Sequence, residues 1–174
     1  MFTIIFFLVF IVVLTYAIGG YSAAPWVPCR TYDAQRFCDL AHIGPNDTVI
    51  ELGCGDARII AAAATLGATC TGYEISLLPY LLAKARTFFS KPRPRILFKN
   101  FWSADISSAT VVAFFLLPAA YERLSKKLLT ELKPGTRIIC YVWPLPPDKW
   151  TPILKDKPTK GLALYVYEIP NRLG

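Results

Sequence analysis

VIELGCGDAR, residues 49–58, is the stretch that decides the fold of this chain. It is an apolar run that ends in a G-x-G turn at Gly53 and Gly55, and about twenty residues later a second apolar run ends at Glu74. A strand, a glycine turn, a helix and a strand that ends in a carboxylate are typical of a nucleotide-type pocket. The glycines let main-chain N–H groups approach a ligand closely, and Glu74 stands where a carboxylate can accept both hydroxyls of a ribose.

The residues around this turn favour S-adenosylmethionine over a dinucleotide. A dinucleotide fingerprint has a glycine three residues after its second glycine, where this chain has Arg58, preceded by Ala57. The acidic Glu51 would lie near a pyrophosphate, which repels a carboxylate, but it suits a ligand with a cationic amino group. S-adenosylmethionine carries such a group and is therefore the expected cofactor.

At these residues the chain resembles the class I, seven-strand methyltransferases, whose motif E/D-x-G-x-G-x-G it matches except that the last glycine is Ala57. Three further stretches carry a more specific resemblance. They are DISSATVVAFFLLPAAYERLSKKLLTELKPGTRII at residues 105–139, APWVPC at residues 24–29 and WTP at residues 150–152. These look like the small lysine methyltransferases of archaea and their membrane-anchored mitochondrial relatives, and the likeness runs from about residue 25 to residue 169. The resemblance implies an α/β fold with a doubly wound, Rossmann-like sheet of seven strands, mostly parallel, with an antiparallel hairpin at its edge.

The N-terminal segment is apolar enough to span a membrane. Residues 2–24 contain no charged side chain, and some twenty helical residues at about 1.5 Å each cross the roughly 30 Å hydrocarbon layer. A cleaved signal peptide is the alternative, because Ser22-Ala23-Ala24 suits a peptidase, but no basic residues precede the apolar run. We therefore expect two units, a transmembrane anchor over residues 1–24 and a methyltransferase domain over residues 25–174.

All charged residues follow this span, so the net charge of +7 belongs to the domain. By the positive-inside rule, Arg30 and Arg36 place the domain of this single-pass membrane protein on the cytoplasmic side, where S-adenosylmethionine is available. The basic balance suits nearby anionic lipid, and an ordinary solvated basic face explains it equally well. Nucleic acid is less favoured as a partner, because the basic residues are spread out and no RNA-recognition motif is present.

Short apolar runs alternate with helical patterns along the domain, which predicts a parallel sheet with right-handed crossovers. Strands are expected at residues 48–52, 69–73, 95–98, 110–115 and 136–142, and helices at residues 33–41, 56–66, 77–89 and 119–132. A last pair of strands, at about residues 150–154 and 162–169 and joined by the charged loop 155–160, would form the edge hairpin.

The five cysteines and His42 show no metal-ligand spacing, so no metal site is predicted. Cys54, Cys70 and Cys140 lie in the glycine turn and in apolar strands, so they are expected to be buried thiols.

Ligands of open α/β sheets bind beyond the carboxyl ends of the strands, so the residues at those ends are the expected cofactor site. An amide such as Asn100 can pair with the amine and a ring nitrogen of adenine, and Phe101 can stack on the base. The alternative for Phe101 and Trp102 is that they fill the core. The expected cofactor-binding residues are Glu51, Gly53, Cys54, Gly55, Glu74, Ile75, Asn100 and Phe101.

The methyl acceptor is expected beside the fourth and fifth strands. Leu116-Leu117-Pro118 stands where many N-methylating enzymes carry a polar motif, so backbone carbonyls there would orient the incoming amine. Tyr141, Trp143 and Trp26 would form aromatic walls, which suit an alkyl-ammonium chain, although the same residues could equally be core. We expect positioning to supply most of the catalysis, with no indispensable base and a rate that rises with pH.

The resemblance implies methyl transfer to lysine side chains of membrane-associated proteins, and a tethered, open site suits such a protruding side chain. A small-molecule or lipid methyltransferase and a non-catalytic S-adenosylmethionine-binding protein are the alternatives.

Overall fold

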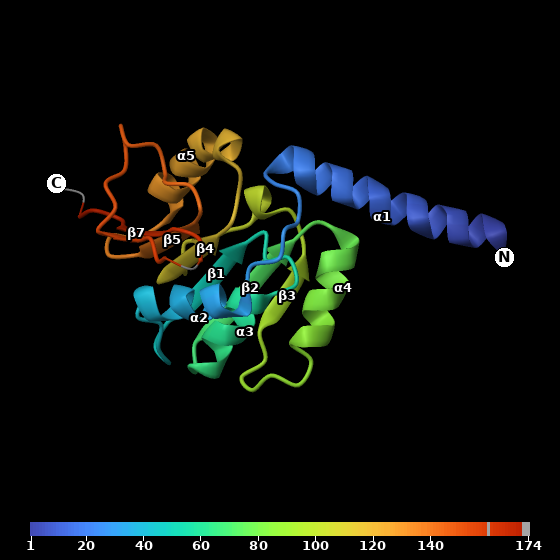
Figure 1. The fold of residues 1–174 in the computed structure, drawn as a ribbon, viewed down its shortest axis with the longest axis horizontal. Coiled ribbons are helices and arrows are strands. Elements are labelled where there is room, and N and C mark those ends of the chain that lie inside the picture. Colours follow the sequence, from blue (N-terminus) through green and yellow to red (C-terminus); the bar gives the residue numbers. More distant parts are fainter. Residues whose placement is uncertain (160, 172–174) are drawn as a thin grey trace.

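A seven-stranded mixed sheet forms the centre of the domain (Figure 1). The computed structural model describes residues 1–159 and 161–171. The strands are β1 (Thr48–Leu52), β2 (Thr69–Glu74), β3 (Arg95–Phe98), β4 (Val111–Phe114), β5 (Arg137–Tyr141), β6 (Leu154–Asp156) and β7 (Leu164–Glu168). Their spatial order is β3-β2-β1-β4-β5-β7-β6. Strands β1 to β5 pair in parallel, whereas β7 runs antiparallel to β5 and β6 antiparallel to β7. The predicted parallel sheet with an antiparallel edge hairpin is thereby confirmed.

Helices cover both faces of this sheet and make it a three-layered domain (Figure 1). Side chains of α2 (Thr31–Leu40), α3 (Arg58–Thr65) and α4 (Leu77–Arg86) join one core cluster, and those of α5 (Tyr121–Glu131) join a second cluster on the other face. Two short 3-10 helices, η1 (Phe101–Ser103) and η2 (Pro118–Ala120), follow the carboxyl ends of β3 and β4. Because the sheet is covered on both faces, β1 and β4 are almost wholly apolar, with Glu51 as the buried charged residue of β1.

Helices α3, α4 and α5 are shorter than predicted. Helix α5 occupies Tyr121–Glu131 rather than residues 119–132, because Pro118–Ala120 form η2. Helix α4 ends at Arg86 rather than at residue 89, and the backbone N–H and the hydroxyl of Thr87 both donate to the carbonyl of Ala83, at 3.0 and 2.8 Å. Helix α3 begins at Arg58 rather than at residue 56, since Ala57 adopts left-handed angles before it. The strand predicted at residues 150–154 lies instead at Leu154–Asp156 as β6, so the predicted loop 155–160 is partly strand. The last residue of that loop lies outside the described part of the chain.

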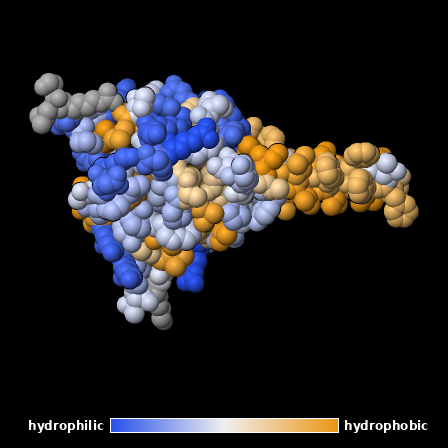
Figure 2. All heavy atoms as spheres, turned by 90° about the horizontal axis from the view of Figure 1, so that it is seen from above, coloured by the Kyte–Doolittle hydropathy of each residue, from blue (hydrophilic) through white to orange (hydrophobic). Residues whose placement is uncertain are grey.

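The N-terminal helix α1 (Phe2–Ser22) projects from the domain as an apolar rod (Figure 2). It is long and apolar enough to cross a membrane, and only 6% of its most apolar window is buried, so it is not the core helix of a soluble domain. Its one buried residue is Gly19, near the end that meets the domain.

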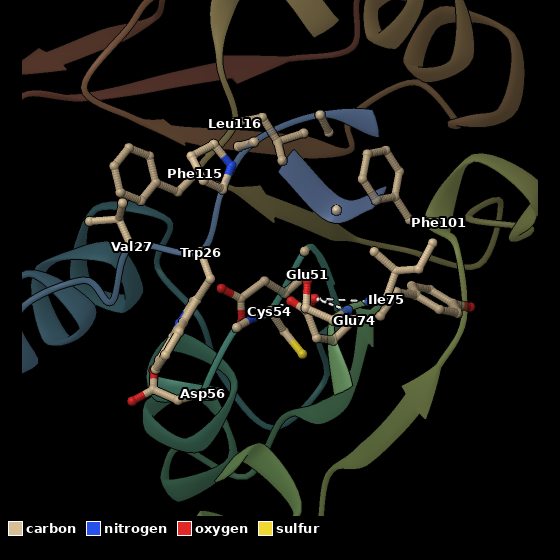
Figure 3. Close-up of a pocket in the computed structure, with 18 of the residues that line it drawn as sticks. Trp26, Val27, Glu51, Cys54, Asp56, Glu74, Ile75, Phe101, Phe115 and Leu116 are labelled. Atoms are coloured by element: carbon tan, nitrogen blue, oxygen red, sulfur yellow. Dashed lines mark hydrogen bonds between the residues drawn. The ribbon is translucent and has the colours of Figure 1, made fainter. Parts of the chain in front are cut away.

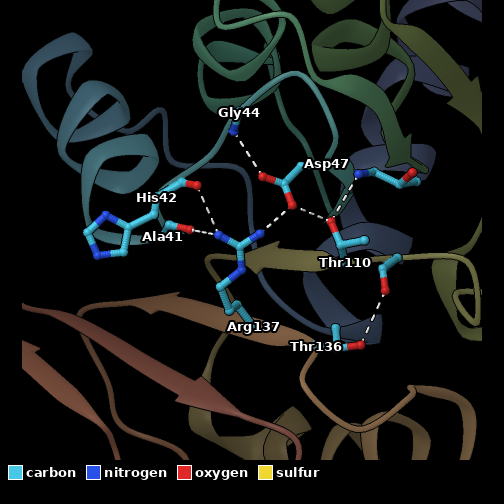
Figure 4. A network of polar contacts seen from close by, with 9 residues as sticks. Ala41, His42, Gly44, Asp47, Thr110, Thr136 and Arg137 are labelled. Atoms are coloured by element: carbon cyan, nitrogen blue, oxygen red, sulfur yellow. Dashed lines mark hydrogen bonds and ion pairs between the residues drawn. The ribbon is translucent and has the colours of Figure 1, made fainter.

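A polar network closes the amino end of the sheet, opposite the carboxyl ends of the parallel strands (Figure 4). The Arg137 guanidinium donates to the carboxylate of Asp47 and to the backbone carbonyls of Ala41 and His42. The same carboxylate accepts the hydroxyl of Thr110 at 2.6 Å. His42 therefore joins this network through its backbone carbonyl. The network holds the amino ends of β1, β4 and β5 together.

Candidate functional site

The main cavity lies at the carboxyl ends of the parallel strands, between β1, β2 and the segment that follows α1 (Figure 3). Its empty space amounts to about 720 Å³, including the part that is open to solvent. The predicted residues that line it are Trp26, Glu51, Gly53, Cys54, Gly55, Glu74, Ile75, Asn100, Phe101 and Leu116. The residues that the sequence predicted for the site come from five different segments, and all of these segments line one cavity.

Glu74 fastens the glycine turn to the end of β2. One carboxylate oxygen accepts the backbone N–H of Gly55 at 2.8 Å, and the other accepts the N–H groups of Ile75 and Ser76 at 2.9 and 2.7 Å. Because an ionised carboxylate offers about four acceptor positions, these three bonds leave room for one more donor. Glu74 thus holds the turn in place while still facing the cavity.

Glu51 presents an unpaired carboxylate oxygen to the same cavity. Within residues 1–159 and 161–171, the buried side-chain N and O atoms without a hydrogen-bond partner are Glu51 Oε2 and Trp26 Nε1, and both residues line the cavity. Burial, and less strongly the charges of Asp56 and Glu74, raise the pKa of Glu51 well above its ordinary value, although a backbone hydrogen bond from Ile60 opposes the shift. An unpaired buried acceptor and an unpaired buried donor in one cavity are available to bind polar groups of a ligand.

Close backbone approaches account for the glycines of the site. A Cβ atom on Gly55 would lie 2.6 Å from the indole of Trp26, and Gly55 has a positive φ of 53°. A Cβ atom on Gly72 would lie 2.7 Å from the sulfur of Cys54. Burial, with the nearby carboxylates, raises the pKa of the Cys54 thiol, so Cys54 is a packing residue here and not a nucleophile.

Ala57 occupies the position of the third glycine in the resembled motif, and its backbone explains why glycine is preferred there. It has φ 60° and ψ 36°, the left-handed conformation, immediately before α3. The Arg58 side chain then turns away from the sheet, pairs with Asp56 at 2.9 Å and donates to the carbonyl of Cys29 at 3.0 Å. Arg58 thereby fixes the segment that carries Trp26 over the turn.

Asn100 and the aromatic residues after it form the opposite side of the cavity. Asn100 accepts the backbone N–H of Trp102 at 3.0 Å, which caps η1 and leaves its amide N–H groups available. Phe101 lines the cavity, and its ring centroid lies 4.5 Å from that of Trp102. The guanidinium of Arg123 lies 4.2 Å above the Trp102 ring. Phe101 therefore faces the cavity, whereas Trp102 packs behind it.

Two of the aromatic residues predicted to surround the methyl acceptor, Tyr141 and Trp143, do not line the cavity. Tyr141 is 1% exposed and its hydroxyl donates to the buried carboxylate of Asp33. Trp143 stacks on Phe115 with centroids 6.0 Å apart. Phe115 itself lines the cavity and stands in front of both residues. Its role was missed at the sequence level because residue 115 was assigned to the fourth strand, which ends at Phe114.

The end of α1 also belongs to the cavity wall, which the sequence did not indicate. Gly19 and Ser22 line the cavity. Ser22 accepts the indole N–H of Trp102 through its hydroxyl at 3.1 Å, and the carbonyl of Ala23 accepts the N–H of Leu117 at 3.2 Å. The apolar helix is therefore joined to the site by hydrogen bonds rather than by a free linker.

Comparison with known proteins gives consistent matches. Residues 51–153 match the ANTKMT methyltransferase domain family. A protein-lysine N-methyltransferase of Saccharolobus islandicus is 37% identical over 152 residues, which cover 83% of this chain and 93% of that protein. An adenine nucleotide translocase lysine N-methyltransferase of Mus musculus is 31% identical over 134 residues, 74% of this chain and 56% of that protein, so the chain spans about half the length of this relative.

A solved structure resembles the domain closely. A Salinibacter ruber protein described as an RNA methyltransferase, in complex with S-adenosyl-L-homocysteine, superposes with a TM-score of 0.77 and 29% sequence identity. The match covers 85% of this chain and 97% of that one. S-adenosylhomocysteine is what remains of S-adenosylmethionine after methyl transfer, so this structural relative holds the product of a methyl donor.

Proposed function

Because the chain belongs to the ANTKMT methyltransferase domain family and is a class I methyltransferase that uses S-adenosylmethionine, we propose that it methylates lysine side chains of membrane-associated proteins. The relatives named as lysine N-methyltransferases support the lysine acceptor. The apolar helix α1, whose end forms part of the cavity wall, supports an acceptor at a membrane.

The cofactor position rests on one observation, the unpaired Glu51 Oε2 and Trp26 Nε1 in the same cavity. The methionine end of S-adenosylmethionine carries an ammonium and a carboxylate, which would pair with this acceptor and this donor respectively. Glu74 has one acceptor position left for a ribose hydroxyl. Asn100 has free amide N–H groups, and Phe101 has a ring that faces the cavity, for adenine.

The chemistry requires little acid–base work from the protein. When bound, S-adenosylmethionine supplies a methyl group that is activated by the positive charge on its sulfur. The chain must hold an uncharged lysine amine in line with that methyl group and exclude water. Phe115, Leu116 and the backbone that follows them lie at the cavity edge beside the end of β4, where they would enclose the lysine stem. Enclosure in apolar surroundings lowers the pKa of an amine and so favours the reactive, uncharged form.

Anchoring would restrict the acceptors to those near a membrane. Helix α1 is 21 residues long, enough for about 32 Å at about 1.5 Å per residue, which matches the hydrocarbon thickness. The first basic residues follow it, and this favours a domain on the cytoplasmic side. Lysines on the loops of integral membrane proteins would then be within reach of the cavity.

The test is the destination of the methyl group. Full-length protein in membranes from cells that lack it is incubated with S-adenosylmethionine carrying a tritiated methyl group, and label is counted separately in protein, lipid and RNA. The proposal predicts label in membrane protein, released as methyl-lysine on hydrolysis. Label in the lipid fraction would assign the small-molecule or lipid alternative, and no transfer despite cofactor binding would leave a non-catalytic binding protein.

RNA is a second candidate acceptor because one structural relative is described as an RNA methyltransferase. The net charge of +7 is compatible with a polyanion. RNA label that survives protease digestion, together with unlabelled protein, would favour this candidate over lysine.

A further inference from the structure

Helix α4 carries an exposed apolar stripe on the side that faces away from the sheet. Leu78, Leu81 and Leu82 are 46%, 53% and 41% exposed, and their i, i+3, i+4 spacing puts them on one face of the helix. Phe88 and Phe89 follow the helix, pack edge to face at 4.8 Å, and are 54% and 87% exposed. Single exposed apolar residues are normal on a soluble domain, but five of them on one helix and the turn directly after it indicate an interaction surface.

The beginning of α4 lies directly against α1. The backbone N–H of Leu77 donates to the hydroxyl of Thr15 at 3.1 Å. Gly19 is buried at this contact, and a Cβ atom there would lie 2.5 Å from the hydroxyl of Ser76. In Figure 1, α4 forms the edge of the domain on the side toward which α1 projects. The exposed stripe is therefore next to the apolar helix and not on a remote surface.

The length of α1 determines how close α4 comes to a bilayer. Residues 2–14, which precede the contact at Thr15, rise only about 20 Å at about 1.5 Å per residue, whereas the hydrocarbon layer is roughly 30 Å thick. The helix spans the layer only if its last two turns lie in the membrane too. Those turns contact Ser76 and Leu77, so the start of α4 must then lie at the membrane boundary.

The charge around the stripe suits the same boundary. Residues 75–104 contain six basic side chains and no acidic one. Arg86 is paired with Asp56 at 2.8 Å. The other five make no ion pair in the part of the chain that the structure describes, and they are Lys84, Lys91, Arg93, Arg95 and Lys99. Cations that flank apolar side chains are typical of helices that lie in the headgroup region of anionic membranes.

We infer that the outer face of α4, with Phe88 and Phe89, is a lipid-contacting surface that lies in the headgroup region of an anionic bilayer beside α1. This inference rests on the proposed function in one respect, that α1 spans the membrane. The surface fixes the tilt of the domain and, since Gly19, Ser22 and Ser76 line the cavity, holds the cavity mouth at the membrane surface. A lysine close to the bilayer would then be reached without further movement of the domain.

The test uses a photoreactive side chain in the full-length protein. Leu82, 41% exposed on α4, is replaced by p-benzoylphenylalanine, and Leu154, 42% exposed on β6 at the opposite edge of the sheet, is replaced in the matched control. Both proteins are reconstituted in vesicles of phosphatidylcholine and phosphatidylglycerol, floated at alkaline pH and irradiated. We expect lipid adducts on the peptide that contains position 82 and at least tenfold fewer at position 154.

The outcomes separate the inference from the proposed anchoring. If the protein floats with the vesicles and position 82 forms no lipid adduct, α1 is an anchor but the lipid-contacting surface is refuted. If position 82 instead crosslinks to another copy of the chain, the stripe is a contact between copies and the inference is also refuted. If the protein does not float, the anchoring fails and the inference fails with it.

Discussion

The backbone N–H of Gly55 donates to a carboxylate oxygen of Glu74 at 2.8 Å, and this bond joins the turn after β1 to the end of β2. Ile75 and Ser76 donate to the other oxygen of the same carboxylate. A charged acceptor that is almost completely buried is stable only because these donors surround it. Glu74 therefore stabilises the folded turn, and we propose that its remaining acceptor position binds a ribose hydroxyl of the cofactor.

Replacing Glu74 should accordingly affect both stability and binding. Glu74→Ala leaves three backbone donors without their acceptor, and we expect a loss of about 3 kcal/mol in the free energy of unfolding together with weaker binding of S-adenosylhomocysteine. Glu74→Gln keeps one acceptor oxygen, so it should lose less stability and less cofactor affinity than Glu74→Ala. Urea titration and calorimetry measure the two effects. Unchanged affinity in a folded Glu74→Ala protein would contradict the proposed ribose contact.

Glu51 should destabilise the protein when the cofactor is absent. Its carboxyl is buried and its pKa is raised, so the folded state keeps a proton that the unfolded state has already released. The contribution of Glu51 to the stability of the cofactor-free protein therefore falls as the pH rises above the ordinary pKa of a carboxyl group. We expect Glu51→Gln to raise Tm relative to the native protein at about pH 8 and to have little effect near about pH 4.

Glu51→Gln should also weaken binding of the cofactor, because a neutral amide replaces the anion that would pair with the ammonium group of the cofactor. In the native protein, affinity should increase with pH as Glu51 loses its proton, and Glu51→Gln should abolish that part of the pH dependence. Calorimetric titration with S-adenosylhomocysteine across the same pH range checks this. A mutant that binds as tightly as the native protein at every pH would show that Glu51 does not meet the ammonium group.

Ala57→Gly should stabilise the domain. Ala57 adopts left-handed backbone angles, which cost an alanine about 1–2 kcal/mol more than a glycine, and the extra flexibility of glycine when unfolded offsets part of that gain. We expect a net gain of up to about 1 kcal/mol in urea titration. Ala63→Gly, the same substitution inside α3, should instead cost about 1 kcal/mol. Destabilisation by both substitutions would contradict the conformation assigned to Ala57.

Phe115 and Tyr141 should respond differently to substitution. Tyr141→Phe removes a buried hydrogen bond to Asp33, so we expect a loss of about 1–2 kcal/mol in stability and an unchanged KM for the methyl acceptor. Phe115→Ala removes a side chain that lines the cavity, and should raise KM roughly tenfold. Steady-state kinetics on one acceptor peptide separate the two. A raised KM in Tyr141→Phe would restore that residue as an acceptor wall.

The sequence predicted the sheet well because its strands are buried on both faces and therefore read as continuous apolar runs. It also brought Glu51, Gly55 and Glu74 to one side of the cavity, since they lie next to strands whose ends meet in a parallel sheet. The side of the cavity proposed for the methyl acceptor was harder to predict from the sequence. Phe115 lines the cavity and Tyr141 does not, and this difference depends on where β4 and β5 end, which composition does not reveal.

The contribution of α1 to the cavity could not be read from the chain either. Gly19 and Ser22 belong to an apolar helix whose pattern indicates only a membrane span. Their contacts with Ser76 and Trp102 join segments more than fifty residues apart, and no periodic pattern in the sequence specifies such a contact.

The central claim is tested most directly by peptide mass spectrometry of membrane proteins for lysine methylation in cells that express the native chain or one of two variants. Gly55→Arg places a side chain in the cavity, against Trp26. Gly135→Arg is the matched control, because Gly135 also has a positive φ, 80°, but has open space around it. We expect a lysine methylation mark that depends on the native chain, survives in Gly135→Arg and disappears in Gly55→Arg. No difference in any lysine mark between native and Gly55→Arg cells would contradict the claim.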